Sequence, residues 1–112
     1  MRRILVCGGR DYADYYHLEE ILSNEISWPE VIISGAASGA DRMAVQWAVT
    51  HGIEFEEYPA QWDLYQNKDG PIRNQQMLDT GIDLVIAFPG GVGTADMVRR
   101  AKKAGVKVIE ID

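Results

Sequence analysis

Short apolar runs alternate along the chain with longer stretches in which apolar residues recur every three or four positions. The short runs predict strands at residues 4–7, 31–33, 53–58, 83–88 and 106–111. The longer stretches predict helices at residues 16–26, 38–52, 70–79 and 97–104. Strand and helix therefore alternate along the chain, and a final strand closes it.

This alternation predicts an α/β fold. Because a helical crossover joins parallel strands, we expect a five-stranded, mainly parallel sheet with helices on both faces, a Rossmann-like three-layer sandwich. The sequence has 112 residues and shows no Pro/Ser-rich linker, low-complexity segment or internal repeat. It therefore indicates a single domain over residues 1–112.

The turns that follow the strands carry most of the chemically distinctive residues. They span residues 8–11, 35–42, 59–73 and 89–94. In a parallel sheet such turns all lie at the carboxyl edge, where ligands bind. The opposite edge carries only single helix-ending glycines. Three of the turns are rich in glycine and lead into helix N-termini, which suit a phosphate or another anion. We therefore expect an anion site at this edge.

The expected ligand-binding residues all belong to these turns or to the helix starts after them: Gly8, Gly9, Arg10, Gly35, Ser38, Gly39, Asp41, Arg73, Asn74, Pro89, Gly90, Gly91, Gly93 and Thr94. Arg73 is included because a cation near a helix N-terminus opposes the dipole and calls for an anionic partner. Several residues also fit a structural role. Ser38 and Thr94 are typical helix N-caps, and Asp41 follows Ser38 at the spacing of a capping box.

Other residues near the turns leave two interpretations open. Arg10 fits either a ligand contact or a surface salt bridge with a neighbouring aspartate. Trp62 and Tyr65 fit either a lid that stacks on a base or a loop packed on the core. Asp96, placed here in the first turn of the last helix, fits either a chemical role or a complement to the helix dipole.

Composition narrows the function classes. The formal net charge of −6 argues against a nucleic-acid partner but leaves room for a small anionic ligand. The single Cys7 cannot form an internal disulfide, which fits a reducing cytoplasm, and its place at the end of an apolar strand predicts a buried, inert thiol. No apolar run is long enough to span a membrane, and we expect no secretory signal. No His/Cys/Asp cluster has metal-ligand spacing, so we expect neither a metal nor a cofactor.

Two common nucleotide-binding motifs are missing. No Gly-x-Gly-x-x-Gly follows the first strand, and no Gly-Lys-Ser/Thr occurs. Ordinary dinucleotide dehydrogenases and P-loop nucleotidases are therefore poor matches.

Taken together, the turns resemble the SLOG superfamily and, within it, the YspA-like branch. The segments that carry the resemblance are residues 8–11, 34–42, 70–74 and 89–96. They spread in order over nearly the whole chain. The resemblance implies a Rossmann-like fold that binds a nucleotide-derived molecule such as NAD, ADP-ribose or a nucleotide. It also implies a sensor or effector in bacterial or phage conflict systems.

The same superfamily contains LOG-type phosphoribohydrolases, which cleave the base from a nucleoside monophosphate. By this resemblance, Asp96 and Arg73 would be the catalytic residues of a nucleotide N-glycoside hydrolase. Here the acid is one methylene shorter than the LOG glutamate, and Met97 replaces a second acid. Ala36 stands where the YspA-like pattern usually has glycine. We therefore expect a binder that acts as a sensor or sequestering protein, with the hydrolase as the alternative.

Two further expectations follow from the superfamily. Its members commonly dimerise, so we expect a homodimer or higher oligomer, with Trp47 or the Trp62 loop as candidate interfaces. Single-stranded DNA binding, as in DprA-type members, is disfavoured by the acidic charge.

Overall fold

The fold is a single parallel sheet between two layers of helices. A computed structural model describes residues 1–59 and 69–112. Its elements are β1 (Arg3–Cys7), α1 (Tyr15–Glu25), β2 (Val31–Ser34), α2 (Ala40–His51), β3 (Glu54–Glu57), α4 (Asp69–Asp79), β4 (Leu84–Ala87), α5 (Val92–Lys103) and β5 (Lys107–Glu110). The strand order is β3-β2-β1-β4-β5, and every pairing is parallel. The predicted α/β architecture is confirmed.

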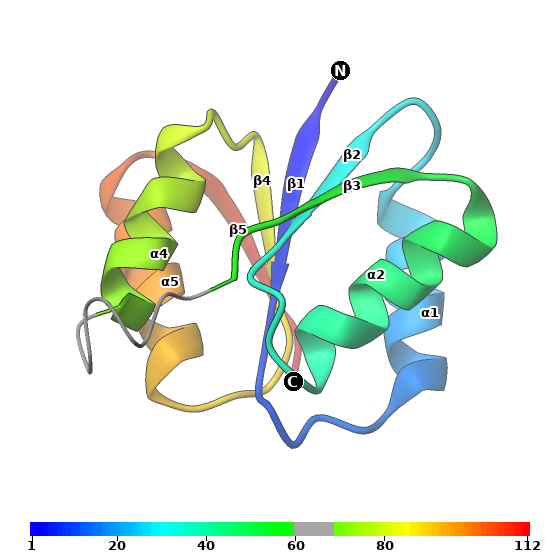
Figure 1. The fold of residues 1–112 in the computed structure, drawn as a ribbon, viewed down its shortest axis with the longest axis horizontal. Helices are drawn as coiled ribbons and strands as arrows, with labels where there is room; N and C mark the ends of the chain where they lie inside the picture. The colour runs from blue at the N-terminus through cyan, green and yellow to red at the C-terminus, as the bar shows by residue number, and fades with distance from the viewer. Residues whose placement is uncertain (60–68) are drawn as a thin grey trace.

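Helices cover both faces of the sheet. In Figure 1, α1 and α2 lie on one side and α4 and α5 on the other. Each face has its own apolar cluster: Leu18 and Trp47 belong to the cluster under α1 and α2, and Met77 and Met97 to the one under α4 and α5. Residues 84–87 of β4 are buried throughout, as expected for a central strand covered on both faces.

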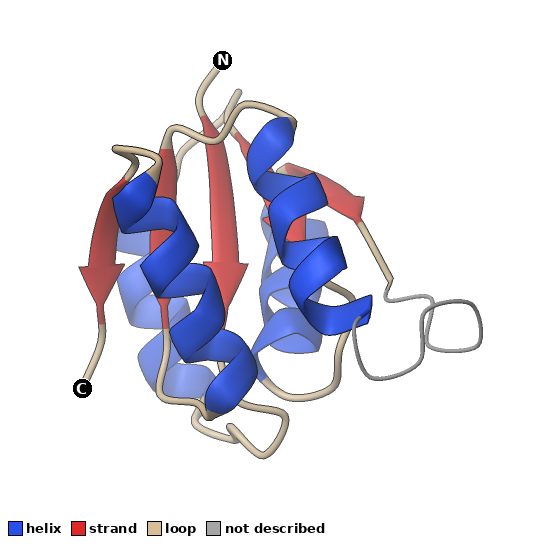
Figure 2. Ribbon diagram, turned by 90° about the vertical axis from the view of Figure 1, so that its left-hand side faces the viewer, coloured by secondary structure: helices blue, strands red, loops and turns tan. Residues whose placement is uncertain are grey.

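The order of the strands reverses at the centre of the sheet. From β1 the chain proceeds outward through β2 to β3, then crosses back to β4 on the other side of β1. The carboxyl ends of β1 and β4 therefore flank a topological switch point, where open α/β sheets bind ligands. Figure 2 shows the strands pointing the same way and the connecting loops gathered below their ends.

The start of α5 lies earlier than the sequence indicates. The helix begins at Val92 with Gly91 as its N-cap, rather than at Met97. Thr94 is therefore inside the helix and is not its N-cap, and Asp96 lies beyond the first turn. Packing overrides the poor helix propensity of Gly-Val-Gly-Thr, because α5 contacts both α4 and the sheet.

Ser38 is likewise not the cap of α2. The N-cap is Gly39, and no side chain caps this helix. The Ser38 hydroxyl instead donates a hydrogen bond to the Arg10 carbonyl, at 3.4 Å. Gly52 ends α2 in the left-handed conformation, as predicted.

Trp47 is a core residue and cannot supply an interface. Its side chain is only 2% exposed, and its indole N–H donates to the Ser23 hydroxyl at 3.2 Å. Its ring stacks on His51 with centroids 4.5 Å apart. The Trp47 alternative for a dimer interface is therefore wrong. The predictions for Trp62 and Tyr65 fall outside the described residues.

In the described ranges, 1–59 and 69–112, every helix is too short or too polar to cross a bilayer.

Candidate functional site

A cavity of about 1080 Å³ opens at the switch point. It is lined by residues from all four carboxyl-edge segments, including these predicted site residues: Gly8, Gly9, Arg10, Gly35, Asp41, Arg73, Asn74, Pro89, Gly90, Gly91, Gly93, Thr94 and Asp96. The structure thus brings together residues that lie up to 88 positions apart, from Gly8 to Asp96. Two predicted residues, Ser38 and Gly39, are not among those that line it.

The first turn is held between its neighbours by backbone hydrogen bonds. The Gly9 N–H donates to the Pro89 carbonyl at 2.9 Å, and the Gly9 carbonyl accepts from Ala40 at 3.2 Å. Gly39 has a φ of +75°, and a Cβ there would overlap the carbonyls of Gly9 and Arg10. Gly39 is therefore required by the close packing of the second turn on the first.

Arg73 crosses from α4 to the end of β2. Its guanidinium donates a hydrogen bond to the Gly35 carbonyl and a longer one, of 3.4 Å, to the Tyr58 carbonyl. A Cβ on Gly35 would overlap this guanidinium, with the Asp41 carboxylate 3.0 Å from the same point. Gly35 thus admits the Arg73 side chain, which lies close to Asp41 on the cavity wall.

Asp41 is a buried carboxyl group in the cavity wall. It is 5% exposed, and burial raises its pKa to about 6 despite the opposing Ala37 N–H, Arg73 and Arg10. The Ala37 N–H donates to its Oδ2 at 3.2 Å. Asp41 therefore braces the loop before α2 and can titrate at mildly acidic pH.

Cys7 lies at the end of β1, under the same wall. Burial raises the pKa of its thiol to about 12, and the charge of Asp41 adds to the effect. The thiol is therefore protonated at neutral pH, and the predicted buried, inert cysteine is confirmed.

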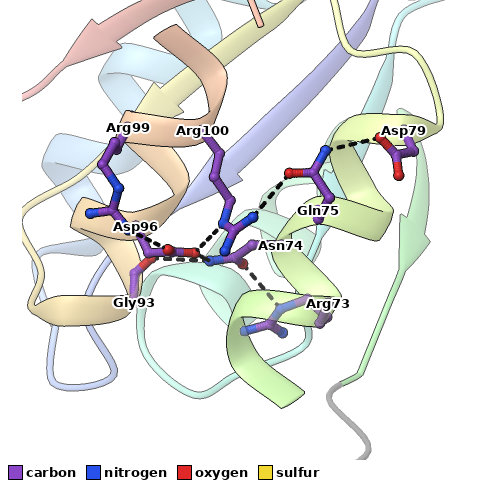
Figure 3. A network of polar contacts seen from close by, with 8 residues as sticks. All are labelled: Arg73, Asn74, Gln75, Asp79, Gly93, Asp96, Arg99 and Arg100. Atoms are coloured by element: carbon purple, nitrogen blue, oxygen red, sulfur yellow. Dashed lines mark hydrogen bonds and ion pairs between the residues drawn. The ribbon is translucent and has the colours of Figure 1, made fainter. Parts of the chain in front are cut away.

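Asp96 is the centre of a polar network between α4 and α5 (Figure 3). Asp96 is 6% exposed, and its carboxylate accepts hydrogen bonds from Asn74 at 2.9 Å, Arg99 at 2.6 Å and Arg100 at 2.8 Å. Burial alone would raise its pKa, but Asn74 and Arg100, with Arg99, outweigh it and hold the pKa below its ordinary value. Asp96 is therefore ionised, and its carboxylate forms ion pairs with Arg99 and Arg100 of its own helix.

Asn74 links the two helices. Its amide nitrogen Nδ2 donates to the Gly93 carbonyl at 3.2 Å and to the Asp96 carboxylate at 2.9 Å. Its carbonyl oxygen accepts from Arg73 Nε at 3.3 Å. Asn74 therefore positions Arg73 through its carbonyl oxygen and the start of α5 through its N–H groups.

The glycines of the fourth turn divide into two kinds. A Cβ on Gly90 would overlap the Thr94 hydroxyl and lie 2.7 Å from the Gly9 nitrogen, so packing excludes a side chain there. A Cβ on Gly91 or Gly93 would meet nothing within 4 Å, and neither has a positive φ. Both are exposed and line the cavity. Neither Gly91 nor Gly93 therefore places a side chain over the start of α5, which lines the cavity.

Comparison with known proteins shows the family of the chain. The model of the YspA, cpYpsA-related SLOG family matches residues 2–65, more than half of the chain. The chain belongs to this family. The match contains the first two turns of the cavity but not the fourth.

This chain is also similar over nearly its whole length to a phage protein. The Gene 61 protein of Mycobacterium phage D29 is 35% identical over 119 aligned positions, which cover 97% of this chain and 95% of the phage protein. The likeness therefore includes the α4–α5 region that the family model leaves unmatched.

Two solved structures share the fold. DNA processing protein A (DprA) from Streptococcus pneumoniae matches with a TM-score of 0.50 and 19% identity over 97% of this chain. The chain spans only 58% of that protein. The C-terminal domain of the PF1911 hydrogenase from Pyrococcus furiosus matches with a TM-score of 0.53 and 20% identity, covering 98% of this chain and 91% of that domain. At these identities the likeness concerns the fold alone.

The SLOG-type second turn carries an unusual residue. Ala36 replaces the expected glycine but keeps its backbone conformation, with a φ of +62°. An L-residue is strained in this left-handed region. Glycine is expected at position 36 because the backbone there has a positive φ.

Several residues at the site were not predicted to belong to it, among them Arg99, Arg100 and Tyr12. Arg99 and Arg100 follow Asp96 at three and four positions, a spacing that places them beside it on a helix. That spacing was the available signal. Tyr12 also lines the cavity, directly after the first turn, but its single position gives no periodic signal.

Proposed function

We propose that this protein binds a nucleotide-derived small molecule, such as a nucleotide, ADP-ribose or NAD, in the cavity at the carboxyl edge of the sheet. The phosphate of the ligand lies at the N-terminus of α5, against the amides after Gly91. The protein acts as a sensor or sequestering protein in the cytoplasm and breaks no bond in the ligand. The family suggests a nucleotide-related function, and the proposal adds the site at which the ligand binds.

The observation that carries the proposal is the pair of glycines at the start of α5. A glycine inside a helix costs up to about 1 kcal/mol relative to alanine. At Gly93 neither packing nor backbone conformation requires that cost, because a Cβ would meet nothing within 4 Å. A ligand that approaches the helix amides closely gives the missing reason, since the N-terminal amides have no intrahelical partner and favour an anion.

The charges around the cavity support an anionic ligand. Arg10, Arg73 and Arg99 line it in a protein whose formal net charge is −6. The Asp96 carboxylate, which would repel a phosphate, is neutralised by Arg99 and Arg100. The three arginines of the lining thus balance its three aspartates, Asp11, Asp41 and Asp96, so the cavity carries less negative charge than the acidic chain as a whole.

The same network argues against the hydrolase alternative. A general base works best with a pKa near the working pH, whereas the pKa of Asp96 is held below its ordinary value. Both of its oxygens already accept hydrogen bonds from cationic side chains. Met97, at the place of the second LOG acid, is 1% exposed and packs in the core, so it offers no replacement.

Calorimetric titration with AMP, ADP-ribose and NAD tests the proposal. We expect saturable binding of at least one of them, weakened several-fold in Arg99→Gln and unchanged in Lys103→Gln. Lys103 is an exposed cation on the same helix, outside the cavity lining. No binding of any of the three compounds would contradict the proposal.

Chromatography of the same mixtures separates binding from hydrolysis. We expect the nucleotides to be recovered intact after prolonged incubation. Release of free base by the wild type, lost in Asp96→Asn, would instead establish the N-glycosidase.

A further inference from the structure

Tyr12 is an aromatic residue fixed at the edge of the cavity. Its N–H donates to the Gly9 carbonyl at 3.2 Å, which closes the first turn. Its ring packs on Phe88, with centroids 5.3 Å apart and planes tilted by 47°. Phe88 is 1% exposed and lies just after β4, so the tyrosine ring rests on the core.

The hydroxyl group of Tyr12 is buried. Its oxygen has no hydrogen-bond partner among residues 1–59 and 69–112. Burial raises the pKa of the phenol, and the charge of Asp14 adds to the effect, so the hydroxyl stays neutral. A buried polar atom without a partner is costly, so the hydroxyl adds no hydrogen bond that would account for the position of Tyr12.

The ring of Tyr12, rather than its hydroxyl, is the part that a ligand in the cavity can contact. Of the described residues that line the cavity, Tyr12 is the one aromatic side chain. With its turn hydrogen-bonded and its hydroxyl covered, the ring is held in one place and loses little freedom on contact with a ligand. A flat apolar surface of this kind suits the face of a heterocyclic base.

The size of the cavity points the same way. At about 1080 Å³ its volume slightly exceeds the range of about 300–1,000 Å³ that is usual for small-molecule sites. A phosphate alone at the start of α5 would leave most of this volume empty. A ligand with a sugar and a base fills it and extends beyond the anion subsite.

We propose that Tyr12 is the base-recognition residue of the site and that it stacks through its ring on the heterocyclic base of the ligand. The inference rests on the proposed function and adds to it the determinant that distinguishes a nucleotide from a sugar phosphate. Recognition uses the aromatic face rather than the hydroxyl, so purine and pyrimidine bases are both accepted.

The experiment compares two probes that differ only in the base. AMP and ribose 5-phosphate are titrated by calorimetry into the wild type, Tyr12→Phe and Tyr12→Leu. The wild type binds AMP at least about tenfold more tightly than ribose 5-phosphate. Tyr12→Phe keeps this advantage, because it retains the ring and removes only the unpartnered hydroxyl. Tyr12→Leu loses the advantage while its affinity for ribose 5-phosphate is unchanged.

Three results would overturn the inference while leaving the proposed function intact. They are equal affinity of the wild type for both probes, an undiminished AMP advantage in Tyr12→Leu, and equal weakening of both probes in that variant, which would assign Tyr12 to holding the turn. A selective loss of AMP affinity in Tyr12→Phe would also overturn it, by assigning recognition to the hydroxyl. If neither probe binds the wild type, the nucleotide-monophosphate form of the proposed function fails with it.

Thermal unfolding of each variant accompanies the titrations. Should Tyr12→Leu not fold, Tyr12→Met takes its place, since a flexible apolar side chain fills the space without a flat face.

Discussion

Asn74 on α4 donates a hydrogen bond of 2.9 Å to the carboxylate of Asp96 on α5, and this contact ties together the two helices that cover one face of the sheet. The same asparagine accepts from Arg73 and donates to the Gly93 carbonyl (Figure 3). A single amide therefore connects the arginine of one cavity wall with the helix start of the other. Asp96 acts through this network as a positioning residue.

The first prediction concerns the central carboxylate. Asp96→Asn should lower the free energy of unfolding by about 2 kcal/mol at pH 7, because a buried acceptor of charged hydrogen bonds is lost while its donors remain. Urea denaturation measures the change. The matched control is Asp79→Asn, an exposed carboxylate hydrogen-bonded to Gln75, which should stay within about 0.5 kcal/mol of the wild type.

The stability difference between Asp96→Asn and the wild type should depend on pH. The pKa of Asp96 is below its ordinary value of 3.8, so its contribution is present above that value and is lost as the pH falls through the folded pKa. The difference should therefore shrink below about pH 4. A difference that stays the same from pH 7 to acid would show that charge plays no part.

The second prediction concerns Asp41, whose pKa shift has the opposite sign. Its folded pKa, raised by burial to about 6, exceeds its ordinary value of 3.8, so the folded state takes up a proton before the unfolded state does as the pH falls. Wild-type stability should decrease as the pH rises from about 4 to about 6, by up to about 3 kcal/mol. Asp41→Asn should lack this decrease.

Denaturation curves across that pH range measure the effect, with Asp79→Asn as the control that keeps the wild-type profile. Binding offers an independent readout, because protonation of Asp41 removes a negative charge from the cavity. ADP-ribose should bind more tightly to the wild type at pH 5 than at pH 8, and Asp41→Asn should reduce that difference. Parallel pH profiles for the wild type and Asp41→Asn would refute both expectations.

Much of the fold could be predicted because its central strands are buried on both faces. Ile4 and Leu5 of β1 and Val85 and Ile86 of β4 are fully buried, so an apolar run marks each strand. Parallel pairing then follows from the helical connections and brings the turns to one edge. The position of the cavity was therefore available from the pattern of apolar residues alone.

The details of the site depend on packing and were less accessible. The sequence after Pro89 has poor helix propensity, yet α5 begins at Val92 because the helix is held by α4 and the sheet. Asn74 and Asp96 are 22 residues apart on different helices, and no local spacing indicates their contact. The Asp96–Arg100 pair, by contrast, has the i, i+4 spacing that sequence alone reveals.

The third prediction concerns the strained second turn. Ala36 has a φ of +62°, where glycine meets no penalty. Ala36→Gly should raise the free energy of unfolding by up to about 1 kcal/mol, since relief of the left-handed strain exceeds the added freedom of the unfolded chain. Its neighbour Ala37 has no positive φ, so Ala37→Gly should lower stability by about 0.5–1 kcal/mol. Equal destabilisation by both changes would show that Ala36 is not strained.

The fourth prediction compares the effect of Gly93 on the stability of the protein with its effect on ligand affinity. Gly93→Ala should raise the thermal stability of the free protein, by up to about 1 kcal/mol, because alanine favours the helix and its Cβ meets no neighbour. The same methyl group projects where the ligand phosphate is proposed to lie, so affinity for ADP-ribose should fall at least about tenfold. Stability and affinity therefore change in opposite directions.

The matched control for this variant is Gly52→Ala at the end of α2. Gly52 has a φ of +67°, and a Cβ there would meet nothing within 4 Å, so alanine should cost about 1 kcal/mol through backbone strain alone. Because Gly52 lies outside the cavity lining, affinity for ADP-ribose should be unchanged. Calorimetry gives the affinity of each variant for ADP-ribose, and thermal unfolding gives the stability of each. Undiminished affinity in Gly93→Ala would contradict a phosphate site at the start of α5, because the added methyl group would project into that site.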